Sequence, residues 1–120
     1  MASVEVKSFD SPDETRPFEG KGEAKVVNVA GRNVGRGRFE PGWKWSQNVK
    51  PIAGTESCEV SHLGYCVSGQ MKVRMDDGSE AEIGPGDVVA IPPGHDAEIV
   101  GDEDCVVIDF GEIEEYAKRS

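Results

Sequence analysis

Short runs in which apolar and polar residues alternate recur along the chain, and glycine or proline separates them. These runs predict eight strands, at 24–30, 33–40, 59–67, 70–76, 79–83, 87–91, 97–101 and 104–110. Alternation with a period of two is typical of strands that bury one face. Because no helical segment lies between them, the pattern favours an all-β fold, an antiparallel jelly roll or double-stranded β-helix that closes into a barrel.

Two turns have specific signatures in this pattern. Asp77-Gly78 lies between two alternating runs and predicts a two-residue hairpin, because glycine readily adopts the positive φ that such a turn requires. Gly84-Pro85-Gly86 ends one strand and begins the next.

Three segments lie outside the alternating pattern. Residues 1–22 are charged and contain proline, so we expect an N-terminal arm, either a solvated lead-in or a strand that pairs with a second subunit. Residues 41–57 are expected to form an irregular loop. In 112–119 acidic residues come first and Lys118 and Arg119 last, which predicts one short C-terminal helix. The chain is thus divided into an arm, 1–22, and a barrel domain, 23–120.

Composition narrows the class of protein. The length of 120 residues suits one domain. A formal net charge of −10 opposes binding to nucleic acid or to an anionic membrane surface. No apolar run approaches the roughly 20 residues of a membrane span, and the first residues lack the features of a signal peptide, so a cytoplasmic protein is expected. The odd number of cysteines, Cys58, Cys66 and Cys105, favours reduced thiols over disulfides.

Gly86, Pro92 and Gly94 follow one another at spacings of six and two residues, and His95 comes directly after Gly94. In this spacing residues 39–110 resemble the cupin superfamily, whose second motif reads G-x5-P-x-G-x2-H, with Ala97 here at the place of the final histidine. Counting back from Gly69 through the first motif, G-x5-H-x-H-x3,4-E-x6-G, puts His62 at the glutamate position and Glu56 and Cys58 at the two histidine positions. The family's usual set of three histidines and one glutamate is therefore absent.

A different ligand set can be built from the residues that remain. If the faces that carry them point into the barrel, Cys58, His62 and His95 converge on the family's metal position, and Glu56 is available as a fourth ligand. Cysteine and histidine favour Zn²⁺, with Fe²⁺ or another divalent ion as the alternative. The competing interpretation is a buried, hydrogen-bonded histidine pair without metal, with Cys58 as a small buried residue.

Aromatic residues supply candidates for ligand contact. Trp43 and Trp45 precede the first motif, where cupin chains cover or line the barrel mouth, so we interpret them as a packed lid or as the wall of a small-molecule site. Tyr65 is interpreted as a core or ligand-wall residue. Arg36 and Arg38 share one face of their strand, which is either turned to an anionic ligand or to solvent or a dimer rim.

The resemblance leaves several functions open, because cupins include isomerases, dioxygenases, decarboxylases and ligand sensors. Our first hypothesis is a small-molecule-binding cupin with a divalent-metal or polar centre inside the barrel, used for sensing or for modest metal-assisted chemistry. The alternatives are a metal-dependent cupin enzyme and a degenerate cupin that acts as a regulatory or dimerisation module. A homodimer is expected, because the strand edges need to be covered.

Overall fold

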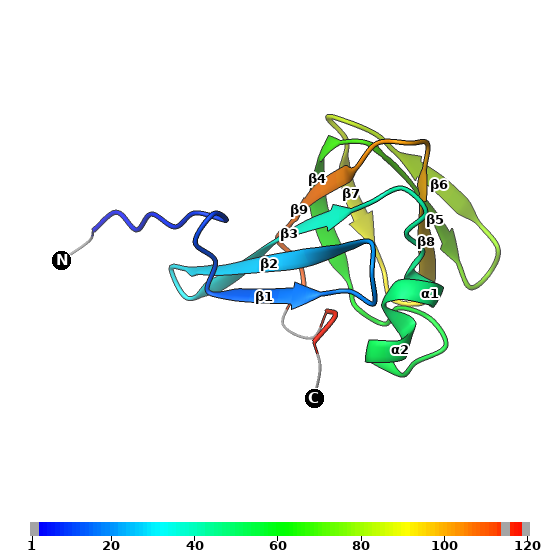
Figure 1. Ribbon diagram of the computed structural model, residues 1–120, viewed down its shortest axis with the longest axis horizontal. Coiled ribbons are helices and arrows are strands. Elements are labelled where there is room, and N and C mark those ends of the chain that lie inside the picture. Colours follow the sequence, from blue (N-terminus) through cyan, green and yellow to red (C-terminus); the bar gives the residue numbers. More distant parts are fainter. Residues whose placement is uncertain (1–2, 114–115, 119–120) are drawn as a thin grey trace.

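The computed structural model, described for residues 3–113 and 116–118, contains two antiparallel sheets (Figure 1). The six-stranded sheet has, in spatial order, β1 (Glu14–Pro17), β2 (Gly22–Val29), β3 (Arg32–Phe39), β9 (Cys105–Asp109), β4 (His62–Ser68) and β7 (Val88–Ile91). The three-stranded sheet has β6 (Glu80–Ile83), β5 (Gln70–Met75) and β8 (His95–Val100). Strands adjacent in space but distant in sequence, such as β3 and β9, are the mark of a jelly-roll topology.

All eight predicted strands are present at their predicted places, which confirms the antiparallel all-β class. The expected closure of the barrel needs correction, since the two sheets are not joined by hydrogen bonds into one continuous sheet. The sheets instead pack face to face over one shared hydrophobic core. Side-chain packing holds the two layers together, as in a β-sandwich.

Inward positions alternate along the strands and fill this core. In β5 the buried residues are Met71 and Val73, and in β8 they are His95, Ala97 and Ile99. The six-stranded sheet contributes its own inward residues to the same cluster, among them Ala24, Val26, Phe39, Cys66 and Cys105. His95 and Ala97 of β8 thus place an imidazole and a small methyl group in the core, where the small side chain leaves room for a site.

Strand β1 forms within the segment expected to be an arm. Its residues pair with β2 of the same chain, with Thr15 opposite Lys25. Residues 3–8, which precede it, have no regular secondary structure, and Figure 1 shows this blue segment leaving the body of the molecule.

The turns are close to those predicted. The loop between β5 and β6 has four residues, Asp76 to Ser79, and the amide of Met75 donates to the carbonyl of Ser79 at 2.8 Å. Gly78 has a φ of 91°, so the positive φ expected of it is present in a loop two residues longer than predicted. Gly86 likewise has a φ of 90° in the turn between β6 and β7.

Two short helices occupy the segment expected to be irregular. They are α1 (Trp45–Asn48) and α2 (Lys50–Ala53), and α2 ends at Gly54, which has a φ of 75°. The expected C-terminal helix includes residues 114–115 and 119, which lie outside the described residues. In the part of the chain that the structure describes, no helix is long and apolar enough to cross a membrane.

Candidate metal centre

Cys58, His62 and His95 come together where the two sheets meet. His62 is the first residue of β4 in the large sheet, and His95 is the first residue of β8 in the small one. The backbone of Cys58 pairs with His95, since its amide donates to the His95 carbonyl at 2.7 Å. One potential ligand atom from each residue lies within 4.8 Å of the other two. The cluster therefore depends on both sheets and on the backbone bridge between Cys58 and His95.

Hydrogen bonds fix the orientation of both imidazoles. The Nδ1 atom of His62 lies 2.5 Å from Oδ2 of Asp109, and the Nδ1 atom of His95 lies 2.8 Å from the carbonyl oxygen of Pro92. A carbonyl or carboxylate oxygen only accepts, so each Nδ1 carries the hydrogen and donates it. With both Nδ1 atoms protonated, each neutral ring has its lone pair on Nε2. This is the tautomer that histidine ligands adopt when a second oxygen orients them.

The separation of the Cys58 and His62 donor atoms fits a tetrahedral ion. The Nε2 atom of His62 lies 3.7 Å from Sγ of Cys58. In a tetrahedral zinc site, bond lengths of about 2.3 Å to sulfur and about 2.0–2.1 Å to nitrogen put the two donors about 3.5–3.6 Å apart. One thiolate and two imidazoles suit Zn²⁺ or Fe²⁺, and three protein ligands leave a fourth position for water or a ligand.

The pKa values of the cluster favour a thiolate. Burial opposes the charged form of Cys58, but hydrogen bonds and positive charge from His62 and His95 outweigh it and lower the pKa of the thiol to about 7. Burial also opposes the charged form of His62, whereas the hydrogen bonds to Asp109 and Cys58 raise its pKa to about 9. A thiolate and a basic imidazole are the states from which metal ligands form, with release of the imidazole proton.

Asp109 belongs to the site, although the sequence analysis did not assign it. It ends β9 and is buried; its Oδ1 accepts from the amide of Gly111 at 2.8 Å while Oδ2 accepts from His62. One signal was available in the sequence. Cys105, Val107 and Asp109 occupy alternate positions of the same strand, and a lone carboxylate in register with apolar inward residues is a buried charge that requires a partner.

Two predicted site residues are not brought to the cluster. The side chain of Glu56 is 97% exposed and pairs with Lys50 at 3.1 Å. Strand alternation does not extend back to it, because residues 54–57 form bends and coil. Tyr65 is 43% exposed and lies on the outer face of β4, opposite to buried Gly64 and Cys66.

A cavity lies beside the histidines. It leaves about 50 Å³ in which a water-sized sphere can move, and apolar side chains from both sheets form most of its wall. This exceeds the roughly 10–15 Å³ that one water molecule needs, so the cavity has room for water or for a small organic molecule. His62, His95 and Asp109 are among the residues that line it, so the open side of the candidate centre faces this space.

Trp43 and Trp45 line the cavity, and are 1% and 2% exposed. Trp43 is held by Phe39, with ring centroids 4.5 Å apart, and by Phe18 at 5.7 Å. The Nε1–H groups of both tryptophans are buried and have no hydrogen-bond partner among the described residues. A buried donor left without an acceptor costs about 1–3 kcal/mol, so these two groups call for an acceptor.

The segment after β9 covers part of the cavity. Ile113 and Tyr116 line it, and the ring of Tyr116 lies edge-on to His62 at 5.2 Å. Burial raises the pKa of Tyr116 well above its usual value, so its hydroxyl stays neutral. Buried Arg16 holds this segment, since its Nη1 donates to the carbonyls of Ile113 and Tyr116.

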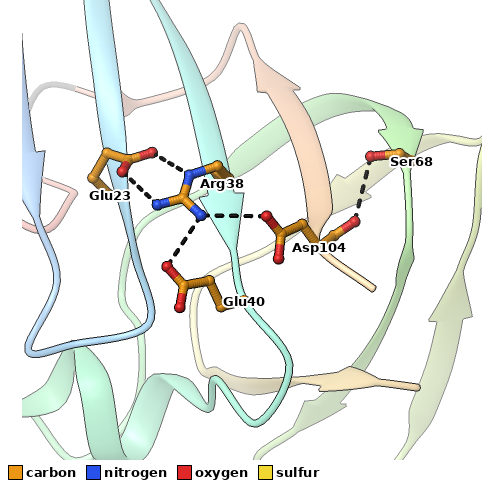
Figure 2. A network of polar contacts seen from close by, with 5 residues as sticks. All are labelled: Glu23, Arg38, Glu40, Ser68 and Asp104. Atoms are coloured by element: carbon orange, nitrogen blue, oxygen red, sulfur yellow. Dashed lines mark hydrogen bonds and ion pairs between the residues drawn. The ribbon is translucent and has the colours of Figure 1, made fainter. Parts of the chain in front are cut away.

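The arginine pair on β3 faces away from the centre. Arg38 binds Glu23 through two hydrogen bonds, of 2.8 and 2.9 Å, and also contacts Glu40 and Asp104 (Figure 2). Arg36 lies over the ring of Phe9 at 5.2 Å. Because three carboxylates of its own chain surround it, Arg38 belongs to the outer face and not to an anion site.

Comparison with known proteins finds similar folds among solved structures. Similar solved structures include a protein of unknown function from Rhizobium leguminosarum (23% identity, 77% of this chain and 83% of that chain, TM-score 0.56). KdgF from Halomonas sp. is 21% identical (82% and 86% of the chains, TM-score 0.57). Oxalate decarboxylase from Lactobacillus farciminis, solved as a formate complex, is 17% identical (TM-score 0.63); the match covers 95% of this chain but only 35% of that enzyme.

These structural similarities concern the fold. No curated protein sequence matches the chain significantly. The family model described as "Cupin domain" matches residues 47–111, which are more than half of the chain and include Cys58, His62, His95 and Asp109. The chain therefore belongs to the cupin family.

Proposed function

We propose that this cupin binds a divalent metal ion through Cys58, His62 and His95 and binds a small molecule at the open position beside it. The observation that carries the proposal is the shared orientation of the two imidazoles. Each Nδ1–H is anchored on an oxygen, and the Nε2 atom of His62 lies 3.7 Å from Sγ of Cys58. A buried histidine pair without a metal does not require both rings to be anchored through Nδ1 beside a thiol.

Zn²⁺ is the ion that this donor set favours first, and Fe²⁺ is the alternative. When bound, a divalent ion supplies a Lewis acid with one open coordination position. The residues of the chain perform the other tasks: Asp109 orients His62, and the apolar wall excludes water from the bound molecule. The size of the cavity favours molecules of a few non-hydrogen atoms over large ring systems such as flavonols.

Metal content decides the first part of the proposal. Protein purified without chelator is expected to carry close to one equivalent of a transition metal, measured by elemental analysis. Less than about a tenth of an equivalent, in protein that also fails to take up added Zn²⁺, would exclude the metal form and leave a polar centre.

Substitutions then test the ligands. Cys58→Ser and His62→Ala are each expected to weaken Zn²⁺ binding at least about tenfold, because each removes one of three protein ligands. Cys105→Ser is the matched control, since Cys105 is equally buried in the core but lies outside the cluster. Unchanged occupancy in Cys58→Ser or His62→Ala would reject this ligand assignment.

A further experiment distinguishes a ligand sensor from an enzyme. A sensor binds its small molecule and releases it unchanged, whereas an enzyme converts it. Incubation of the metal-loaded protein with small carbonyl compounds, followed by product analysis, distinguishes them. Turnover that is lost in Cys58→Ser but kept in Cys105→Ser would establish the enzymatic alternative.

A further inference from the structure

The polar groups of the cavity define the chemistry of its ligand beyond what the candidate metal centre requires. None of the described residues that line it is lysine or arginine. The charged groups on its wall are Asp109 and, through its hydrogen bond to that carboxylate, His62. The positive charge of His62 is already paired with Asp109, so an anionic ligand would find no further positive side chain among the described lining residues. Burying an unpaired charge is strongly unfavourable.

A bound divalent ion does not change this balance. Its two positive charges are matched by the thiolate of Cys58 and the carboxylate of Asp109, and both histidines bind as neutral ligands. The complete centre is then electrically neutral. This differs from the family's usual set of three histidines and one glutamate, which keeps one positive charge. The present residues favour a neutral ligand.

The two indoles add a requirement for an acceptor. Trp43 and Trp45 line the cavity, are almost completely buried, and each has an Nε1–H without a partner among the described residues. Phe39 and Phe18 pack against Trp43, so its indole is held in place. A ligand that brings an oxygen acceptor satisfies a donor that is otherwise unpaired, whereas a hydrocarbon of the same shape leaves it unpaired.

We propose that the cavity selects a small, uncharged carbonyl compound, and that Trp43 or Trp45 determines this specificity by donating its indole N–H to the carbonyl oxygen or to a second acceptor of the ligand. The inference rests on the proposed function for the neutral charge of the centre. The role of the indoles rests on the cavity itself. A cavity of about 50 Å³ limits the ligand to a few non-hydrogen atoms.

Three probes of one shape test the inference: 2-butanone, propionate and 2-methyl-1-butene. They differ in whether they carry a neutral acceptor, a charge or no acceptor. Both tryptophans of the chain line the cavity, so tryptophan fluorescence reports on its occupant. In zinc-loaded protein, 2-butanone is expected to bind about tenfold more tightly than propionate and about fivefold more tightly than the hydrocarbon. Propionate binding as tightly as 2-butanone would overturn the neutral-ligand assignment.

Variants identify the donor. Trp43→Phe and Trp45→Phe keep an aromatic ring but remove the N–H, and one of them is expected to weaken 2-butanone binding about fivefold while hydrocarbon binding changes less than about twofold. Tyr65→Phe, on the outer face of β4, is the control and leaves all three affinities unchanged. If both tryptophan variants bind 2-butanone as tightly as the unsubstituted protein does, the proposed role of the indoles is wrong.

A measurement on the unsubstituted protein covers the case in which a variant does not fold. Proton NMR detects indole N–H groups directly, and 2-butanone is expected to move the resonance of at least one of the two downfield while 2-methyl-1-butene moves neither. Metal content is measured on the same sample. If the protein carries metal but prefers propionate, this inference is wrong and the proposed function stands. If the protein carries no metal, the proposed function is wrong, and the indole resonances still show whether a tryptophan donates to the ligand.

Discussion

At the scale of single residues, a substitution of Asp109 tests whether the carboxylate that orients His62 strengthens metal binding. Its carboxylate orients the His62 ring and raises the pKa of that imidazole. Asp109→Asn keeps an acceptor but removes the charge, so the imidazole becomes a weaker ligand. We expect Zn²⁺ affinity to fall about 10–100-fold, as for other second-layer carboxylates, measured by competition with a chromophoric chelator.

The control for Asp109→Asn is Asp96→Asn. Asp96 neighbours His95 in the sequence, but its carboxylate accepts from the amides of Ser46 and Ala97 and lies outside the cluster. Zn²⁺ affinity in this variant should match that of the unsubstituted protein. Equal losses in the two variants would mean that the effect is a general consequence of removing a carboxylate.

The sequence identified those members of the centre that occupy motif positions or belong to a rare residue type. Cys58 and His62 stand at the places of family ligands, and His95 is the only other histidine in the chain. Glu56 also stands at a motif position, but the bends before Cys58 direct its side chain to solvent. Asp109 and Tyr116 were not assigned to the centre, because their contacts with His62 join positions about 50 residues apart and depend on the pairing of β4 with β9.

At the scale of elements, Gly69 controls the connection between the two sheets. It has a φ of 72°, and a Cβ atom there would lie 2.5 Å from both the carbonyl oxygen of Asp104 and the Cα of Cys105. Gly69→Ala therefore combines an unfavourable φ with a backbone clash, and we expect it to lower the free energy of unfolding by about 3 kcal/mol or more. Chemical denaturation measures this loss.

Gly31 offers a matched comparison for Gly69. Its φ is 74°, but a Cβ atom there would meet no atom within 4 Å. Gly31→Ala should lower the free energy of unfolding by only about 1 kcal/mol, which is the contribution of φ alone. Similar losses at the two positions would show that the close approach of β9 does not restrict Gly69.

The charged network on β2 and β3 predicts a pH dependence. Its hydrogen bond to Arg38 lowers the pKa of Glu23 below the usual value of 4.5. A carboxyl group whose pKa is lowered by folding stabilises the protein above the unfolded pKa and loses this contribution as pH falls through the folded pKa. Arg38→Gln should therefore lower the free energy of unfolding by about 1 kcal/mol at pH 7 and low salt, and by clearly less at pH 3.

Denaturation curves at the two pH values measure the contribution of the network. Salt should reduce the effect at pH 7, because the residues are partly exposed. Arg74→Gln is the control, since Arg74 lies outside this network. A loss in Arg38→Gln that is the same at pH 3 and pH 7 would contradict the assignment to Glu23.

The elements that the sequence predicted were those with a clear period and a turn signal. The alternation of Met71, Val73 and Met75 before Asp77-Gly78 is sufficient to place β5 and the turn that follows. Strand β1 gave no such signal, because charged residues and a proline make up most of Glu14–Pro17. The helices α1 and α2 have four residues each, too short for a helical period to be visible.

At the scale of the whole molecule, the expected homodimer remains a prediction. The outer face of β4 exposes Leu63, Tyr65 and Val67, and β7 exposes Val88 beside them. Apolar side chains gathered on one sheet face are typical of surfaces that another protein covers, here proposed to be a second copy of the chain. Sedimentation or light scattering measures the mass in solution, and a monomeric mass would refute the prediction.

Arg16 connects the first strand to the wall of the cavity. It is the buried arginine of β1, and its Nη1 donates to the carbonyls of Ile113 and Tyr116, which line the cavity. Arg16→Met leaves both carbonyls without this charged donor, so we expect the free energy of unfolding to fall by about 2–4 kcal/mol. The segment that covers the cavity should also open more often.

Acrylamide quenching of tryptophan fluorescence separates these two effects, because Trp43 and Trp45 lie in the cavity. Under conditions in which Arg16→Met remains folded, quenching should increase, since the quencher reaches the indoles through the loosened segment. Arg32→Met, at the exposed start of β3, should change neither stability nor quenching. If Arg16→Met loses stability while quenching stays constant, Arg16 supports the fold without controlling access, and small molecules then enter the cavity by another route.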